Sequence, residues 1–247
     1  MIDLALIGGT GLYTFPGLAD VEEVRPGTAW GETSDVIVRG RLGGRSLAFL
    51  ARHGRAHDIA PHQVNYRANL AALKALGAAR IVGVNAVGGI RDDMGPRVLA
   101  VPDQIIDYTH GRITSFGDGT GGAVTHIDFS EPYSPGLRRD LLGAAQRASV
   151  PIVDGGCYGA TQGPRLETRA EIARMRRDGC DLVGMTGMPE AALARELGVE
   201  YACLALVANW AAGCGDEAEI SLEEIYANLE HATAQVPPIV RELLSGR

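Results

Sequence analysis

The sequence has no apolar run that approaches the length of a membrane span. Its first residues also lack the basic stretch and long apolar core of a signal peptide. Acidic residues outnumber basic ones, so the formal net charge is −7 and the pI is near 5.4. A chain of this charge is a poor candidate for binding nucleic acid. These absences predict a cytoplasmic protein without membrane or nucleic-acid partners.

Cysteine is scarce as well. The four cysteines are Cys157, Cys180, Cys203 and Cys214, and no two of them form a Cys-x-x-Cys pair. The sequence therefore offers no zinc or redox motif of that kind. We expect free thiols in a reducing compartment.

Apolar residues are plentiful, at 46% of the 247 residues, and charged residues make up 21%. This balance is typical of a globular protein with a large core. Short apolar runs alternate with segments of helical spacing, without repeat or linker. We expect one α/β domain over residues 1–247, with a central mixed sheet flanked by helices. The expected strands are 3–9, 35–40, 46–52, 80–89, 97–107, 152–160, 181–185 and 201–209. The expected helices are 64–77, 134–150, 168–179, 189–198 and 221–244.

Two segments have further features. Pro237 and Pro238 predict a kink or a split in the last helix, and Ser221 with Glu224 forms a candidate capping box at its start. The stretch 109–128 is rich in Gly, Thr and Ser and predicts one long loop. Loops of that length in a compact domain are usually functional or disordered.

A glycine-rich turn, IGGTGLY at residues 7–13, directly follows the first expected strand. Backbone N–H groups of such a turn hold phosphate, and Thr10 adds a hydroxyl group. The turn matches neither the G-x-G-x-x-G dinucleotide pattern nor a Walker loop. It is a candidate phosphate loop of another kind, or a plain tight turn.

Basic side chains cluster after the expected strand at 46–52, namely Arg52, His53, Arg55, His57 and His62. Their spacing fits no helix-borne zinc site, and the arginines would repel a metal cation. Arginine beside histidine suits a phosphate or a carboxylate. The alternative is a solvated basic loop.

Three further strand ends carry polar or small residues: Asn85 with Ala86, Met185 with Thr186, and Asn209. Each of them alone is a weak signal, because a bulge, a helix cap or a turn also accounts for it. Ligands of open α/β sheets bind where strand ends converge. Together these ends predict a crevice for a small anionic molecule at one edge of the sheet.

The segment TQGPRLETRAE, residues 161–171, reads as a loop that opens a helix. Helix openings attract anions, yet Glu167 stands here between Arg165 and Arg169. Either this carboxylate is an ordinary residue of a helix start, or it is aimed at a ligand.

These motifs, in this order, resemble the trimeric purine nucleoside phosphorylases and methylthioadenosine phosphorylases. The resemblance rests on IGGTGLY, RHGRAHDIAPHQVNYRAN, GPRLETRAE, MTGMPEAALARELG and the strand that ends in Asn209. It covers nearly the whole chain. It implies a nucleoside phosphorylase fold, a homotrimer, no metal, and phosphorolysis of an N-glycosidic bond with inorganic phosphate as the co-substrate.

The resemblance also implies roles for individual residues. The phosphate-binding set is Thr10, Arg52, His53, Asn85, Ala86 through its backbone, and Thr186. The family has threonine at the position of Asn85. The alternative basic pair is Arg55 with His57, if the motif G-R-x-H is matched to the nucleoside phosphorylase branch instead. The catalytic residues are His53 and Asn209.

Around the nucleoside, the resemblance implies contacts from Leu166, Glu167, Met185, Asn209, Trp210, Ala211 and His126. Met185 lies on the ribose in this scheme. His126 matches a residue that the methylthioadenosine branch contributes from the neighbouring subunit.

The two branches of the family differ at the positions that contact the base and the sugar, and these positions predict the specificity. The methylthioadenosine branch has serine at Glu167 and aspartates at Asn209 and Ala211, whereas Glu167 with Asn209 resembles the 6-oxopurine branch. A carboxylate accepts from the N1–H of hypoxanthine, while adenine N1 is itself an acceptor. At the sugar, Leu222 stands where the nucleoside branch has a histidine for the 5′-hydroxyl, and Ile225 and Tyr226 follow one turn on. Apolar residues there resemble the methylthio branch.

The combination predicts 5′-methylthioinosine as the substrate, with hypoxanthine and 5-methylthioribose 1-phosphate as the products. One alternative is a broad 6-oxopurine phosphorylase that acts on inosine and guanosine, and another is a methylthioadenosine phosphorylase. Two alternatives of other classes are a nucleoside hydrolase and a nucleotide-sensing protein without turnover.

Overall fold

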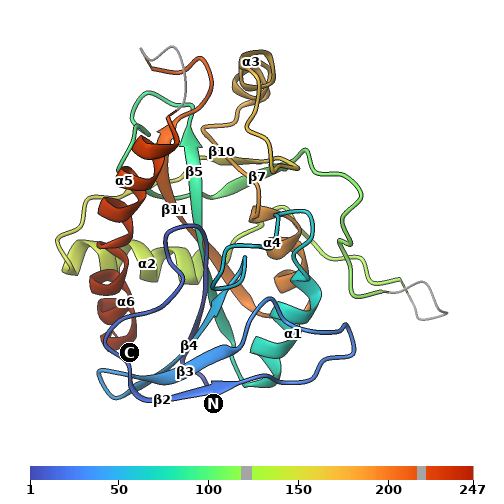
Figure 1. Ribbon diagram of the computed structural model, residues 1–247, viewed down its shortest axis with the longest axis vertical. Coiled ribbons are helices and arrows are strands. Elements are labelled where there is room, and N and C mark those ends of the chain that lie inside the picture. Colours follow the sequence, from blue (N-terminus) through green and yellow to red (C-terminus); the bar gives the residue numbers. More distant parts are fainter. Residues whose placement is uncertain (118–123, 216–220, 247) are drawn as a thin grey trace.

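The computed structural model describes residues 1–117, 124–215 and 221–246. In these ranges a mixed sheet of 11 strands forms the centre of the molecule, and helices lie on both of its faces (Figure 1). No helix among the described residues is long and apolar enough to cross a membrane.

The strands are β1 (Leu4–Gly8), β2 (Ala19–Val24), β3 (Ile37–Leu42), β4 (Arg45–Ala51), β5 (Arg80–Gly89), β6 (Leu99–Val101), β7 (Gln104–Asp107), β8 (Val153–Asp154), β9 (Cys157–Ala160), β10 (Leu182–Gly184) and β11 (Glu200–Trp210). The helices are α1 (Tyr66–Ala75), α2 (Pro135–Arg147), α3 (Arg169–Asp178), α4 (Gly187–Glu196), α5 (Leu222–Thr233) and α6 (Val236–Ser245).

The sheet is interrupted beside its central strand, β5. The strand order is β2-β3-β4-β1-β5-β10-β9-β7, and β11 pairs with β5 along its whole length. Because β11 fills one side of β5, the strands β1 and β10 share the other side. Parallel β1 reaches as far as Gly83 of β5, and antiparallel β10 comes from the opposite end as far as Gly88. Residues 84–87 between them have no strand neighbour on that side among the residues that the structure describes, and we call this stretch the sheet break.

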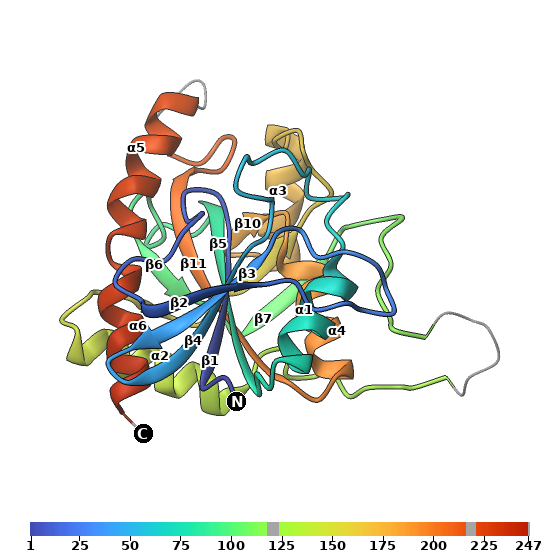
Figure 2. The same cartoon turned by 60° about the horizontal axis from the view of Figure 1, so that its bottom comes forward.

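Two layers of helices cover the sheet (Figure 2). Apolar residues of α1 and α4, such as Leu70 and Leu193, pack with one face of the sheet. Those of α2, α5 and α6, such as Leu141 and Ile239, pack with the other face. Helix α3 packs near β10 in a smaller cluster around Ile172. The expected arrangement of a mixed sheet between helices is confirmed.

The expected elements are found with three differences. Pro102 divides the expected strand 97–107 into β6 and β7. Gly155 and Gly156, both with positive φ, divide 152–160 into β8 and β9. Strand β2 was not expected at all, because its sequence ADVEEV is nearly all exposed and has no apolar alternation.

The end of the chain follows the expectation from its prolines. The last helical pattern is split into α5 and α6, with prolines in the first turn of α6. Ser221 accepts a hydrogen bond from the backbone N–H of Glu224 at 3.4 Å, as expected of a helix cap. In the long segment 109–128 the described residues form neither helix nor strand, and 118–123 lie outside the described part of the chain.

Candidate functional site

A cavity of about 450 Å³ opens at the sheet break. The turn after β1, the turn after β4, the middle of β5, the end of β10 and the end of β11 all contribute to its lining, and α5 closes one side. The strand ends therefore converge as expected, but not at one edge of the sheet. They meet in its middle, because β10 runs antiparallel and brings its carboxyl end back toward β1.

The guanidinium of Arg52 occupies the sheet break. It donates from Nη1 to the carbonyl of Val84 at 3.0 Å and from Nη2 to that of Ile7 at 3.4 Å. These are backbone groups that a neighbouring strand would otherwise pair. Two further N–H groups bind the carboxylate of Glu190, both at 2.8 Å. One N–H on Nη1 has no acceptor among the described residues, and Arg52 contributes to the lining of the cavity.

The ion pair between Arg52 and Glu190 is fully buried. Burial alone would lower the pKa of the guanidinium, but the charge and hydrogen bonds of Glu190 outweigh it and raise the pKa. The hydroxyl of Tyr201 donates to the same carboxylate at 2.7 Å. The pair is thus a structural link between β4, α4 and β11 as well as part of the cavity floor.

His53 lies beside Arg52 and is neutral at ordinary pH. Burial and the charge of Arg52 lower the pKa of His53 from 6.5 to about 4. Its Nδ1 lies 2.8 Å from the carbonyl of Ile59. Because a carbonyl only accepts, Nδ1 carries the hydrogen, and Nε2 keeps a lone pair that can accept from a ligand.

The alternative basic pair is separated. His57 contributes to the cavity lining, and its Nε2 lies 3.4 Å from Thr10 Oγ1. Arg55 points away and pairs with Glu23 at 2.6 Å, with its side chain 42% exposed. Only His57 of this pair lies in the cavity. His62 is exposed and is absent from the lining.

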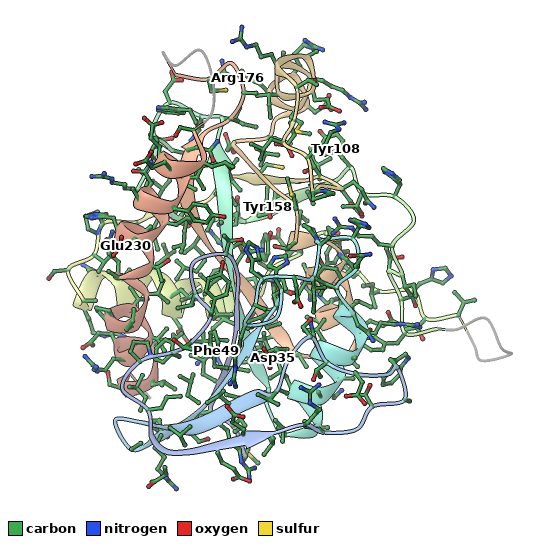
Figure 3. The ribbon with its side chains drawn as sticks, viewed as in Figure 1. Asp35, Phe49, Tyr108, Tyr158, Arg176 and Glu230 are labelled. Carbon is green, nitrogen blue, oxygen red and sulfur yellow. The ribbon has the colours of Figure 1, made fainter. Side chains whose placement is uncertain are left out.

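Asn85 stands behind the cavity rather than in it. Its side chain is fully buried and donates from Nδ2 to Thr186 Oγ1 at 2.8 Å. Thr186 makes no side-chain cap to α4, and because its Oγ1 accepts from Asn85, its hydroxyl hydrogen remains to be donated. The backbone N–H of Thr186 faces the hydroxyl of Tyr158 at 3.4 Å, near the middle of the molecule (Figure 3). Ala86 and Thr186 both line the cavity.

Glu167 is not a residue of the helix start. The cap of α3 is Thr168, and the first-turn carboxylate is Glu171, which completes a capping box and pairs with Arg165. Glu167 precedes the cap and contributes to the cavity lining. Its Oε1 accepts from Thr161 Oγ1 at 2.6 Å. Burial raises the pKa of Glu167, although that hydrogen bond opposes the rise.

Asn209 enters the cavity from an irregular point of β11. The register between β11 and β5 shifts between Val207 and Asn209, and such a bulge re-aims a side chain. The amide Nδ2 of Asn209 donates one N–H to the carbonyl of Trp210 at 2.6 Å and keeps a second. Ala211 lines the cavity. The indole of Trp210 packs against Gly95 and Gly215 instead, outside the cavity lining.

The remaining wall is largely apolar, and Tyr226 adds a phenolic hydroxyl to it. Met185 comes from the end of β10, Leu166 from the loop before α3, and Leu222, Ile225 and Tyr226 from α5. His126 is exposed and is not among the residues around this cavity. The described parts of the segment that carries it extend away from the sheet (Figures 1 and 2).

Sequence reasoning missed Glu190, which neutralises Arg52. It also missed the stretch Asp58–Pro61, which forms another side of the cavity. Glu190 stands 138 residues from Arg52 and gives no local signal. Among the described residues, no group of three or more His, Cys, Asp or Glu side chains could hold a metal ion.

Comparison with known proteins places the chain in a family. The family model described as the phosphorylase superfamily matches residues 3–245. A Xanthomonas campestris protein named "Probable S-methyl-5'-thioinosine phosphorylase" is 59% identical over 99% of this chain and 98% of its own length. A 6-oxopurine nucleoside phosphorylase of Pyrococcus furiosus is 46% identical over 85% of this chain and 80% of its own.

A solved structure of a related enzyme has the same fold as this chain. The methylthioadenosine phosphorylase from an antarctic soil metagenomic library has a TM-score of 0.92 and 38% identity, over 99% of this chain and 85% of that one. The chain belongs to the phosphorylase superfamily. It is a nucleoside phosphorylase, and hence a pentosyltransferase that uses phosphate as its co-substrate.

Proposed function

We propose that the enzyme cleaves 5′-methylthioinosine with phosphate and gives hypoxanthine and 5-methylthioribose 1-phosphate. One observation carries this proposal: a single cavity is lined both by a half-buried carboxylate, Glu167, and by apolar side chains of α5. The first feature suits a 6-oxopurine, and the second suits a methylthio group. The relative with 59% identity bears the corresponding name.

Phosphate would bind at the sheet break. Thr10, Arg52, Ala86 and Thr186 all line the cavity, and each has a donor for phosphate: two hydroxyls, the remaining guanidinium N–H and the backbone N–H of Ala86. Val84 directs its carbonyl into the break, and Ala86, two residues further along the pleat, faces the same way. Neutral His53 would accept the hydrogen of monohydrogen phosphate through Nε2. We assign the phosphate to Arg52 and His53 rather than to Arg55.

The reaction needs placement and charge stabilisation more than covalent help. A phosphate oxygen forms a bond to the anomeric carbon as the bond from that carbon to the purine nitrogen breaks. The electron pair of the broken bond stays on the purine. Asn209 would stabilise that charge by donating its second N–H to O6 or N7.

Glu167 would select the base. Thr161 donates to Oε1, and Oε2 would accept from the N1–H of hypoxanthine. Adenine presents a lone pair at N1, which leaves two acceptors opposed in a buried place. Leaving a buried polar group unpaired costs ~1–3 kcal/mol, and sites built on such pairs discriminate by up to ~10⁴-fold.

Helix α5 would select the sugar. Leu222 and Ile225 offer no hydrogen bond to a 5′-hydroxyl, and burial of a methylthio group against them contributes ~1–3 kcal/mol. Met185 would lie on the ribose, and Leu166 and Ala211 beside the base. Trp210 would then act through its carbonyl, which holds the Asn209 amide, and not through its ring.

We further propose a cytoplasmic homotrimer of single-domain chains, in which His126 reaches the neighbouring sugar site. Exposed apolar side chains support this arrangement. Ile113 and Val124 on the extended segment are 59% and 80% exposed, and Leu222 and Tyr226 at the cavity mouth are 65% and 54% exposed. Contact between copies would cover both sets.

One assay tests the substrate. Base release is measured from methylthioinosine, inosine, methylthioadenosine and adenosine, with and without phosphate. We expect strict phosphate dependence, with methylthioinosine at least ~10-fold better than inosine, and both better than methylthioadenosine. Equal release without phosphate would favour a hydrolase. Inosine ahead of methylthioinosine would favour the broad 6-oxopurine phosphorylase, for which the 46% identical relative is the precedent.

A further inference from the structure

Arg112 lies in the extended segment between β7 and α2, and its half-buried guanidinium uses all its donors inside the protein. Nη1 donates to the carbonyls of Met185 at 2.7 Å and Met188 at 2.6 Å. Nη2 donates to the carbonyls of Thr161 at 3.1 Å and Gln162 at 2.8 Å. Four backbone carbonyls from two separate segments thus meet on one side chain.

Two more contacts fix the guanidinium itself. Nε donates to the side-chain oxygen of Gln162 at 3.2 Å, and the plane lies over the ring of Tyr66, 5.8 Å from its centre. The oxygen of Gln162 also accepts from the backbone N–H of His110. Arg112 is therefore held in place from both sides.

Each of the two segments that Arg112 joins carries a residue proposed for the nucleoside side, and the second also carries Thr186 of the proposed phosphate set. The first runs from Thr161, whose hydroxyl holds Glu167. The second runs from Met185, which lines the cavity, to the start of α4. Arg112 itself is absent from the lining. Its contacts set the spacing between a residue proposed for the base and a residue proposed for the ribose.

We propose that Arg112 is a positioning residue for nucleoside recognition, which acts through Thr161 and Met185. The inference rests on the proposed function of Glu167. Lysine cannot replace it, because an ammonium group has three donors and no planar fork that reaches carbonyls on two segments. The phosphate side has its own support, since Asn85 holds Thr186 and Glu190 holds Arg52.

The test compares Arg112→Lys and Arg112→Met with wild type in steady-state phosphorolysis. We expect the KM for methylthioinosine to rise at least ~10-fold in both variants, while the KM for phosphate changes less than ~3-fold. Because Glu167 loses its fixed position, the preference for methylthioinosine over methylthioadenosine falls at least ~10-fold. Loss of fold stability alone would move neither the substrate ratio nor the KM split.

Two other variants keep the outcome decisive. Gln162→Met removes only the side-chain oxygen that braces Nε, and we expect a ~3-fold rise in the nucleoside KM even if the Arg112 variants do not fold. Arg138→Met is the matched control, because Arg138 also donates to two backbone carbonyls, those of Val101 and Pro102, which do not belong to the cavity lining. We expect wild-type KM values and substrate ratios from it.

An unchanged nucleoside KM and an unchanged base preference in Arg112→Lys and Gln162→Met would overturn the proposal. So would an equal shift in Arg138→Met. Failure of the proposed substrate is seen separately, as a wild-type enzyme that prefers another nucleoside. In that case the change caused by each variant is read on the nucleoside that the wild type prefers.

Discussion

A single guanidinium, that of Arg52, both completes the hydrogen bonding of the interrupted sheet and stands at the floor of the cavity. A buried charge of this kind is tolerated because Glu190 neutralises it with two hydrogen bonds. Removal of one partner leaves the other charge buried and alone. Arg52 therefore stabilises the fold in addition to lining the cavity.

Replacement of Arg52 should thus affect more than phosphate affinity. We expect Arg52→Met to lower the free energy of unfolding by ~3–5 kcal/mol, measured by urea denaturation. Arg55→Met is the control, since Arg55 makes a surface ion pair that contributes ~1 kcal/mol or less. Losses of equal size in the two variants would show that the Arg52–Glu190 pair is not a structural link.

Stability should also depend on pH through His53. Its pKa in the folded protein is about 4, below the ordinary 6.5 of the unfolded chain. Between pH 4 and 6.5, His53 is protonated in the unfolded chain and neutral in the folded protein. The stabilisation by neutral His53 is therefore complete above pH 6.5 and is lost as the pH falls toward 4, by ~3 kcal/mol at most.

The measurement is the urea midpoint of wild type and His53→Gln across this pH range. We expect the wild-type midpoint to fall more steeply on acidification than that of the variant. Parallel curves would mean that the proton is not excluded from His53 in the folded protein.

Base preference should follow Glu167 and Asn209 together. The paired change Glu167→Ser with Asn209→Asp removes the acceptor that faces N1–H and adds a carboxyl group that, when protonated, donates to adenine. We expect the kcat/KM ratio of methylthioinosine to methylthioadenosine to fall ~10²-fold or more. Glu171→Ser is the control at the same helix opening, and it should cost stability through the lost capping box but leave the ratio unchanged.

At the scale of elements, α5 presents one apolar stripe to the cavity. Leu222, Ile225, Tyr226 and Leu229 recur at i, i+3, i+4 and i+7, the spacing of one helix face. Only Leu229 is deeply buried, so the first turn of the helix is bound loosely to the core. Its residues can therefore change with little cost in stability.

Leu222→His should shift the sugar preference toward a hydroxyl group. The imidazole supplies the polar partner that inosine lacks, so we expect the kcat/KM ratio of inosine to methylthioinosine to rise ~10-fold. Glu223→His places the same side chain on the same turn but outside the lining, and it should leave the ratio unchanged. If the two variants behave alike, α5 does not contact the 5′ position.

The sequence predicted most elements of the fold, and it assigned Thr10, His53, Glu167, Met185 and Asn209 to one site; all five line the same cavity. Apolar runs and turn residues are local signals, and they marked each strand that is buried. Strand β2 escaped because its residues are exposed. The sheet break and the partner of Arg52 could not be predicted, because they depend on pairing between segments far apart in the chain.

At the scale of the whole molecule, we expect a homotrimer of three times the 26.0 kDa chain mass in sedimentation experiments. Val124→Asp should weaken the assembly, because it places a charge on an apolar residue that is 80% exposed in the single chain. Val21→Asp is the control, as Val21 is also apolar and 57% exposed but lies on the edge strand β2. An active monomer would contradict the trimer.

His126→Ala should lower activity on methylthioinosine if the neighbouring chain supplies that residue.

The carboxylate and the apolar wall come from different elements, the connection before α3 and the helix α5. Free-energy effects of residues that do not contact each other usually add. The preference for the base and the preference for the sugar can therefore be changed separately. A fold-change in kcat/KM from one set of substitutions multiplies the fold-change from the other. With two small sets of substitutions, one at positions 167 and 209 and one at position 222, descendants of such a chain could reach all four combinations of purine and sugar.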